Sequence, residues 1–314
     1  MRAIVIDQPG SPDVMKLVDR PIPQPTKNES VMRIHAFGVH RYEVLTREGG
    51  SPSVTFPRVI GVEAVGEMAA VSDNSPLKVG QKVITMMGGL GREVDGSYQD
   101  YALINDKHLF PVTYTGDWVS LAQYPENFYT AIGAIKSLGL KAGQTLLVRG
   151  GTTAVGLATV QLAKAYGLNV TATTRRETMT DALVENGADA AVLDVKNALQ
   201  TEQSFDGIVD MVGTVTLTNS IAHLNQGGHV CLIGLLSGEW IMKNFNPFIL
   251  AGKTLTVFDS TEVKPELVTE MFDLIAKDQL SIPIAKVFKL DEIKAAHEYV
   301  MASRELGQVI VDND

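Results

Sequence analysis

Cysteine is nearly absent from this sequence. Cys231 is the only one among 314 residues, so neither an intrachain disulfide nor a zinc centre built from several cysteines can form. It follows a glycine pair in an apolar stretch, residues 227–234, where we expect a buried and unreactive thiol. No two of the six histidines have the spacing of a helical metal site.

Long apolar runs and excess positive charge are missing as well. No stretch approaches the roughly 20 residues that span a bilayer, and residues 1–7 lack the apolar centre of a signal peptide. The net charge of −9 argues against nucleic acid or an acidic membrane as a partner. A hydrophobic content of 45% with 20% charged residues allows a substantial core. Because the sequence shows neither a signal peptide nor a membrane-spanning run, we expect a cytoplasmic protein.

The pattern of apolar residues predicts two domains of different character. Short runs separated by proline and glycine fill the first hundred residues (2–7, 30–38, 59–70, 82–87 and 98–104) and predict a β-rich domain. From residue 131, strands alternate with helices (strands at 145–149, 169–174, 190–193, 207–211, 229–233 and 254–258). This alternation predicts an α/β, Rossmann-type doubly wound parallel sheet. We assign residues 122–264 to it, and residues 1–121 and 265–314 to the β-rich domain.

Residues 145–167 read as a strand, a turn of small residues and a helix that stops near Gly167. Such a turn can hold a dinucleotide pyrophosphate, because the first N–H groups of a helix have no internal partners. The usual three glycines would fall on Gly151, Thr153 and Gly156, so the middle position departs from the pattern. The alternative is a plain strand–helix connection. One hypothesis is that Thr152 and Thr153 compensate by donating hydroxyl hydrogen bonds to phosphate.

The end of the next strand bears on the choice of cofactor. An NAD site usually has an acidic residue there, whereas this strand runs through Thr174 into Arg175 and Arg176. Guanidinium groups offer forked, charge-assisted donors to a 2′-phosphate, which favours NADPH over NADH. The alternative is that both are solvated surface arginines.

Segments along almost the whole chain share a common pattern. In order, they are residues 56–66, 79–83, 96–101, 129–131, 149–156, 186–189, 205–213, 227–228 and 306–310. Through them the chain resembles the zinc-free, zeta-crystallin-like quinone oxidoreductase branch of the medium-chain dehydrogenase/reductase superfamily. The resemblance implies that the β-rich domain is GroES-like.

The resemblance also assigns the metal and cofactor positions. Zinc enzymes of the superfamily carry a histidine ligand where Val62 stands, and a further ligand, usually cysteine, near His40, so we expect no metal. We expect Glu63 to remain as a buried hydrogen-bonding group. Thr130 matches a position beside the nicotinamide, and residues 212–213 and 234–235 match strand ends that edge it. The expected cofactor-binding residues are Thr130, Gly151, Thr152, Thr153, Ala154, Val155, Gly156, Thr174, Arg175, Arg176, Val212, Gly213, Gly234 and Leu235.

The implied substrates are small molecules, quinones or α,β-unsaturated carbonyls, which take up a hydride at a conjugated carbon. Charge then develops on an enolate oxygen that needs a hydrogen-bond donor. His40 and Tyr42 are the candidate catalytic residues, although family members commonly have Asn where His40 stands. The alternative is that both side chains have only structural roles, His40 as a hydrogen-bonded residue and Tyr42 in packing. Two further functions stay open, an enoyl-thioester reductase and a non-catalytic NADPH-binding protein serving as a sensor or structural protein. The resemblance implies a homodimer formed through residues 248–258. Burial in the core would explain the apolar residues of this segment equally well.

Overall fold

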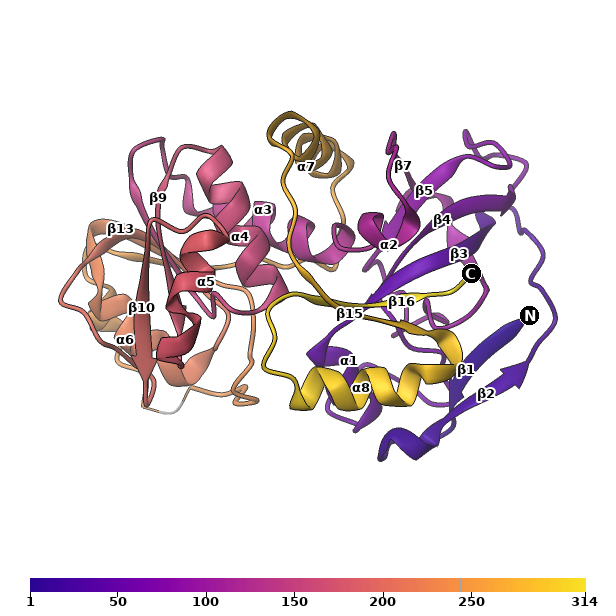
Figure 1. The fold of residues 1–314 in the computed structure, drawn as a ribbon, viewed down its shortest axis with the longest axis horizontal. Coiled ribbons are helices and arrows are strands. Elements are labelled where there is room, and N and C mark those ends of the chain that lie inside the picture. The colour runs from indigo at the N-terminus through magenta and orange to yellow at the C-terminus, as the bar shows by residue number, and fades with distance from the viewer. Residues whose placement is uncertain (243) are drawn as a thin grey trace. The chain divides into compact units, whose positions relative to one another are not determined.

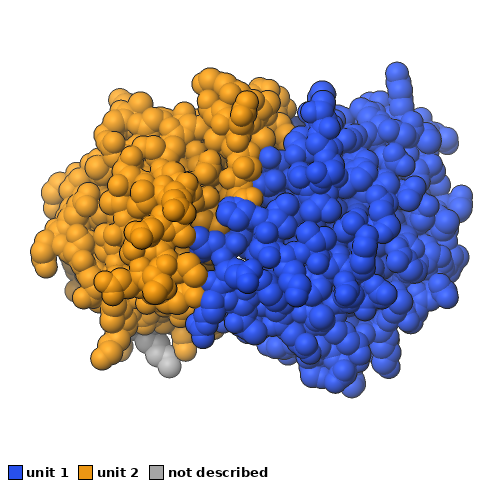
Figure 2. Space-filling model, viewed as in Figure 1, with its two compact units in different colours: residues 1–126, 261–268, 283–314 blue, residues 127–260, 269–282 orange. Residues whose placement is uncertain are grey.

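The computed structural model describes residues 1–242 and 244–314, which form two compact units (Figure 2). Unit 1 contains Met1–Glu126, Thr261–Val268 and Pro283–Asp314, and unit 2 contains Asn127–Ser260 and Thr269–Ile282. None of the helices in the described ranges has the length and apolar character needed to cross a membrane.

Unit 2 is built on a doubly wound parallel sheet (Figure 1). The strand order is β11-β10-β9-β8-β12-β13-β14, in which only β11 runs antiparallel to its neighbour. Because crossovers are right-handed, the helix after β8 and the helix after β12 cover opposite faces of the sheet. The predicted α/β fold class is confirmed. The strands are β8 (Thr145–Arg149), β9 (Asn169–Thr174), β10 (Ala190–Val195), β11 (Ala198–Leu199), β12 (Phe205–Asp210), β13 (Leu224–Leu232) and β14 (Thr254–Val257).

The central strands are apolar on both faces, as a covered parallel sheet requires. In β8 and β12 nearly every residue is buried, and side chains such as Leu147 and Ile208 join one core cluster with residues of the α6 helix. Cys231 is fully buried in β13, and burial raises the pKa of its thiol to about 11, as expected for an unreactive cysteine. The helices are α3 (Pro125–Leu138), α4 (Ala154–Ala165), α5 (Thr180–Glu185), α6 (Thr214–Ala222) and α7 (Pro265–Asp278), with 3-10 turns η3 (Glu177–Met179) and η4 (Pro247–Leu250).

Unit 1 contains a second, mostly antiparallel sheet with the order β15-β16-β3-β4-β5-β7, and β6 also pairs with β3. Helix α8 lies beside α1 although some 250 residues separate them (Figure 1). The elements are β1 (Arg2–Ile6), β2 (Met15–Asp19), β3 (Glu29–Val39), β4 (Glu63–Ala70), β5 (Lys82–Met86), β6 (Tyr101–Asn105), β7 (Phe110–Pro111), β15 (Ile284–Lys289), β16 (Gln308–Asp312), α1 (Arg41–Arg47), α2 (Trp118–Leu121), α8 (Ile293–Ala302), η1 (Pro12–Val14), η2 (Asp106–His108) and η5 (Leu290–Glu292).

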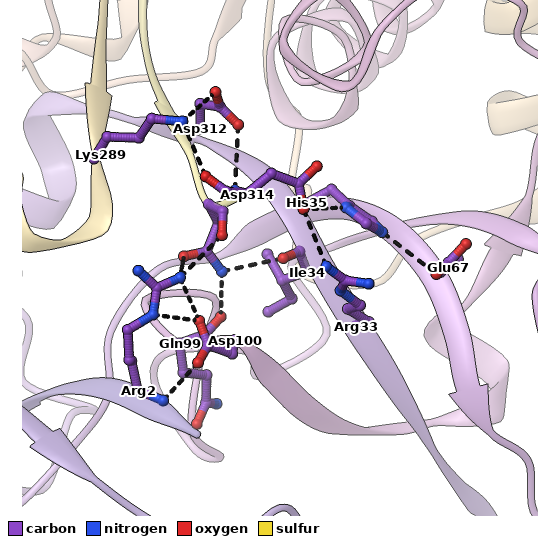
Figure 3. Close-up of polar contacts among 11 residues, drawn as sticks. Arg2, Arg33, Ile34, His35, Glu67, Gln99, Asp100, Lys289, Asp312 and Asp314 are labelled. Carbon is purple, nitrogen blue, oxygen red and sulfur yellow. Dashed lines mark hydrogen bonds and ion pairs between the residues drawn. The ribbon is translucent and has the colours of Figure 1, made fainter.

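Side chains from distant parts of unit 1 hold the chain after β16 (Figure 3). The Arg2 guanidinium donates to the Asp100 carboxylate at 2.8 Å and to the main-chain carbonyl of Asn313 at 3.0 Å. His35 Nδ1 lies 2.7 Å from Asp314 Oδ1. Together with the β16–β3 pairing, these contacts hold the last segment in unit 1.

The two units divide the chain differently from the expected domains in three places: residues 122–126 and 261–264 fall in unit 1, and residues 269–282 fall in unit 2. Within 269–282, the later part of α7 is bonded to unit 2. Glu270 accepts hydrogen bonds from Lys136 of α3 at 2.8 Å and from Tyr166, just after α4, at 2.7 Å.

Candidate functional site

The carboxyl ends of four strands of unit 2 meet around the turn that follows β8. Gly150 N donates to Thr173 Oγ1 of β9 at 3.0 Å, and Met211 N, just after β12, donates to the Arg149 carbonyl at 3.1 Å. Leu236 N, beyond β13, donates to the Met211 carbonyl at 3.2 Å. In doubly wound sheets, ligands bind at this edge, where the strand order reverses.

The turn packs closely against α4 and β9 because Gly151 and Gly156 have no Cβ. A Cβ on Gly156 would lie 2.4 Å from the Gly150 carbonyl oxygen, and a Cβ on Gly151 would lie 2.9 Å from the Ala172 Cβ. Residues 152–155 remain partly exposed at the N-terminus of α4, which favours an anion. This arrangement fits the pyrophosphate of a dinucleotide.

Thr153 has a structural role in the turn. Its hydroxyl donates to the Gly150 carbonyl at 2.9 Å and accepts from Gly156 N at 3.0 Å, so it caps α4. Donation from this hydroxyl to phosphate stays a prediction, and it requires the bond to the Gly150 carbonyl to break. Thr152 makes no such bond among the described residues and keeps the suggested role as a prediction.

Arg175 and Arg176 follow β9 directly, at the same edge of the sheet. Thr174 Oγ1 accepts from Arg176 N at 3.1 Å, which fixes the backbone where the strand ends. The Arg175 side chain is exposed and Arg176 is partly exposed. Both side chains are therefore at least partly accessible at this edge of the sheet.

The expected nicotinamide-edging residues also come together. Gly213 has φ 114°, and a Cβ there would meet the Leu235 side chain at 3.0 Å. A Cβ on Gly234 would meet the Met211 carbonyl oxygen at 2.7 Å. Val212 and Leu235 are partly exposed beside this close backbone packing. Thr130, the remaining expected contact, lies in α3 and is 6% exposed.

The candidate catalytic residues lie in unit 1, within a buried acidic cluster. His40 Nε2 is 2.6 Å from Glu63 Oε1, and its Nδ1 is 3.9 Å from Glu126 Oε2. The Tyr42 ring stacks on the His40 ring, with centroids 5.0 Å apart. Glu43 accepts from the His40 main-chain N–H at 2.9 Å, and so turns the chain into α1. As expected, Glu63 is a fully buried hydrogen-bonding group.

The electrostatics of this cluster keep its proton donors protonated. Burial alone would lower the pKa of His40, but the Glu63 carboxylate outweighs it, with help from Glu126 and Glu43, and the pKa rises to about 9. Burial and the same carboxylates hold the pKa of Tyr42 well above its usual range. The buried Tyr42 hydroxyl has no hydrogen-bond partner among the described residues. Tyr42 therefore carries a proton that no neighbour in the described chain accepts.

Zinc does not fit the residues at the ligand positions. Val62 has no donor atom, and the His40 nitrogens face two carboxylates rather than an open coordination position. Within residues 1–242 and 244–314, no group of three or more His, Cys, Asp or Glu side chains has the arrangement of a metal site.

Two family models match the chain, the alcohol dehydrogenase GroES-like domain over residues 26–114 and the zinc-binding dehydrogenase over residues 154–277. A quinone oxidoreductase from Pongo abelii is 31% identical over 331 residues, which cover 99% of this chain and 97% of the relative. The chain belongs to the quinone oxidoreductase branch of the medium-chain dehydrogenase/reductase superfamily. As a member of this branch it is an oxidoreductase, and the superfamily binds nicotinamide cofactors.

One further relative and one solved structure carry other names. An acryloyl-coenzyme A reductase from Sulfurisphaera tokodaii is 24% identical over 336 residues, 99% of both chains. The yhdH oxidoreductase from Salmonella enterica, solved in complex with NADP, has a TM-score of 0.85 at 21% identity, and the match covers 100% of both chains. That likeness shows a shared fold.

Sequence reasoning missed two groups of buried polar residues. Glu43 and Glu126 complete the cluster around His40, and Glu43 could have been found from its place three residues after a helix N-cap. Arg149 and Asp210 each end a strand directly after apolar residues, and both are fully buried. A charged residue at the end of a buried strand was the available signal.

Proposed function

We propose that this oxidoreductase uses NADPH and reduces a quinone or an α,β-unsaturated carbonyl without zinc. One observation carries the choice of cofactor: Arg175 and Arg176 follow β9 directly, at the strand end where an acidic residue would bind the ribose hydroxyls of NAD. Arginine suits a 2′-phosphate because it presents a planar fork of donors to the phosphate oxygens.

The protein would hold the cofactor along the strand ends of unit 2. The turn at residues 150–156 would bind the pyrophosphate, and Arg175 and Arg176 would bind the 2′-phosphate. The nicotinamide end would lie against residues 212–213 and 234–235. When bound, NADPH supplies a hydride from its nicotinamide C4. The chain's own task is then to orient the reactants and to stabilise charge on the substrate oxygen.

Tyr42 is the better of the two candidate donors to that oxygen. The Nε2 of His40 is bonded to Glu63 and its Nδ1 faces Glu126, whereas the Tyr42 hydroxyl proton has no acceptor in the described chain. A pKa held above its usual range keeps the phenol protonated, so it can donate to a developing enolate. Tyr42→Phe should lower kcat for a simple quinone about a hundredfold, the scale of losing one oxyanion donor. Unchanged kcat would remove Tyr42 from this role.

The cofactor proposal is tested by titrating the protein with NADPH and NADH in thermal-shift experiments. A ligand at about a hundred times its dissociation constant adds roughly 2.7 kcal/mol of stability, which the melting curve reveals. We expect more stabilisation by NADPH than by NADH, and loss of that margin in the Arg175→Ala/Arg176→Ala double variant. Arg20→Ala, at an exposed arginine of unit 1, is the matched control. If neither cofactor shifts the melting curve, the protein does not bind nicotinamide cofactors, and the proposal fails.

A second candidate is an enoyl-thioester reductase, favoured by the acryloyl-coenzyme A reductase relative. It shares the hydride chemistry but must also accept a carrier arm. Turnover of acryloyl-coenzyme A compared with a simple enone and a quinone separates the two functions. Cofactor binding without turnover of any of the three would support a non-catalytic NADPH-binding role.

We also propose a homodimer formed through the β14 edge of unit 2. β14 is the last strand in the sheet order, so it presents an unpaired edge among the described residues. Val257 in β14 is 64% exposed, and the segment that leads to β14 contains three more exposed large apolar side chains, Trp240 (69%), Ile241 (75%) and Phe248 (84%). A second copy of the chain would pair this edge and cover these side chains.

A further inference from the structure

Arg149, the last residue of β8, is a fully buried guanidinium group. It forms a forked ion pair with Asp194 of β10, with Nε–Oδ2 and Nη2–Oδ1 distances of 2.8 and 2.9 Å. Nη2 also donates to the Asn197 carbonyl at 2.9 Å, in the turn between β10 and β11. The group therefore connects the ends of two strands that are not neighbours, since β9 lies between them.

The remaining donor of Arg149 points to α6. Nη1 donates to the Ser220 hydroxyl at 2.9 Å and to the Thr216 carbonyl at 3.0 Å. Ser220 in turn donates its proton to Asp210 Oδ2 at 2.7 Å. The Ser220 hydroxyl is thus the bridge between Arg149 and Asp210.

Asp210 ends β12 and fixes the backbone that follows it. Its Oδ1 accepts from Val212 N at 2.9 Å and from Gly213 N at 3.1 Å, and the Thr216 hydroxyl also donates to the carboxylate. These two residues form the turn that, under the proposed function, edges the nicotinamide. The carboxylate thus orients the turn, and the Arg149–Ser220 bridge orients the carboxylate.

We propose that Arg149 is a positioning residue of the cofactor site, which acts through Ser220 and Asp210 on the Val212–Gly213 turn. The inference rests on the proposed function, because it assumes that a nicotinamide lies against this turn. A buried charge network could instead serve stability alone. However, ion pairs are costly to bury, and replacing them with apolar residues often leaves the stability of a protein unchanged. A positioning role predicts that breaking the bridge disturbs the placement of the nicotinamide end of the cofactor but not the binding of its adenosine end.

Ser220→Ala is the variant of choice, because it removes the bridge and leaves the Arg149–Asp194 ion pair in place. Removing Arg149 itself would leave two buried carboxylates without their cation and could unfold the protein. Ser220→Thr keeps the hydroxyl and is the rescue variant. Ser137→Ala is the control, since it deletes a serine hydroxyl that donates to the Gly133 carbonyl in another helix of unit 2.

The measurements are kcat with a simple quinone, and the dissociation constants of NADPH and of adenosine 2′,5′-bisphosphate, which lacks the nicotinamide. For Ser220→Ala we expect kcat to fall about tenfold, because the nicotinamide end is misplaced. Binding of the bisphosphate should be unchanged, and Ser220→Thr should recover most of kcat. Ser137→Ala should match the wild type in every measurement.

Two results would overturn the inference. One is a Ser220→Ala protein with a lower melting temperature but wild-type kcat, which would make the bridge purely structural. The other is an equal loss of affinity for both ligands, which would mean that the whole site is disturbed. A wild-type protein that binds neither ligand would refute the proposed function itself, and the positioning role with it.

Discussion

Gly156→Ala should weaken cofactor binding strongly while the fold survives. The added Cβ would lie 2.4 Å from the Gly150 carbonyl oxygen and within 3.0 Å of two Gly151 backbone atoms. Ordinary contact begins at 3.4 Å, so the turn and α4 must separate by 3.4 − 2.4, or about 1 Å. No side-chain rotation can relieve this, because all three atoms belong to the backbone.

The change affects stability and binding differently. Overpacking costs about 1–3 kcal/mol, while alanine recovers about 1 kcal/mol of helix propensity over glycine. A net loss of at most about 2 kcal/mol lowers Tm by up to about 8 °C, which the folded protein tolerates. Opening the turn by this distance should break at least one hydrogen bond to a charged phosphate, worth about 1.5–3 kcal/mol, so the NADPH dissociation constant should rise roughly tenfold to a hundredfold.

Isothermal titration with NADPH measures the affinity, and differential scanning calorimetry measures the stability. Gly10→Ala is the control, because its added Cβ meets only the Val14 side chain, which can move, in unit 1. The control should bind NADPH like the wild type. A Gly156→Ala protein with wild-type affinity would show that the turn does not hold the pyrophosphate, and the reasoning from backbone packing would be refuted.

Three further predictions concern other parts of the chain. Asn313→Ala should cost about 1–3 kcal/mol in urea unfolding, because its amide donates to two main-chain carbonyls at 3.1 Å; wild-type stability would contradict this. Because the pKa of His40 is about 9 in the fold, against 6.5 in the unfolded chain, the protonated side chain stabilises the fold by up to about 3 kcal/mol. This contribution is complete below pH 6.5 and is lost as the pH rises to about 9. Glu63→Gln should therefore flatten the fall in urea midpoint between pH 6.5 and 9, and an unchanged slope would count against the pairing. Phe248→Asp should convert the proposed dimer to a monomer in light scattering, whereas a dimeric variant would place the interface elsewhere.

The fold could be predicted because its signals are local. The strand–helix alternation from residue 131 predicted the parallel sheet of unit 2, which the strand order confirms. The strand predicted at 59–70 begins only at Glu63, because Gly61 adopts φ 105° and the carbonyls of Val59, Ile60 and Gly61 bond to the N–H groups of residues 96–98. Periodicity shows that such a segment is buried, but not that its backbone pairs with a loop.

The site could be predicted only where its residues lie next to one another in the sequence. The turn at 150–156 and the arginines after β9 are of this kind, since their neighbours in sequence are their neighbours in space. Arg149 is different: its partners Asp194 and Ser220 are 45 and 71 residues away, and only the strand order brings them together. A single sequence shows a charge at the end of an apolar strand without showing what compensates it. Yet a buried charge must be compensated, and the structure supplies the partners of Arg149 and Asp210 from β10, through Asp194, and from α6, through Ser220.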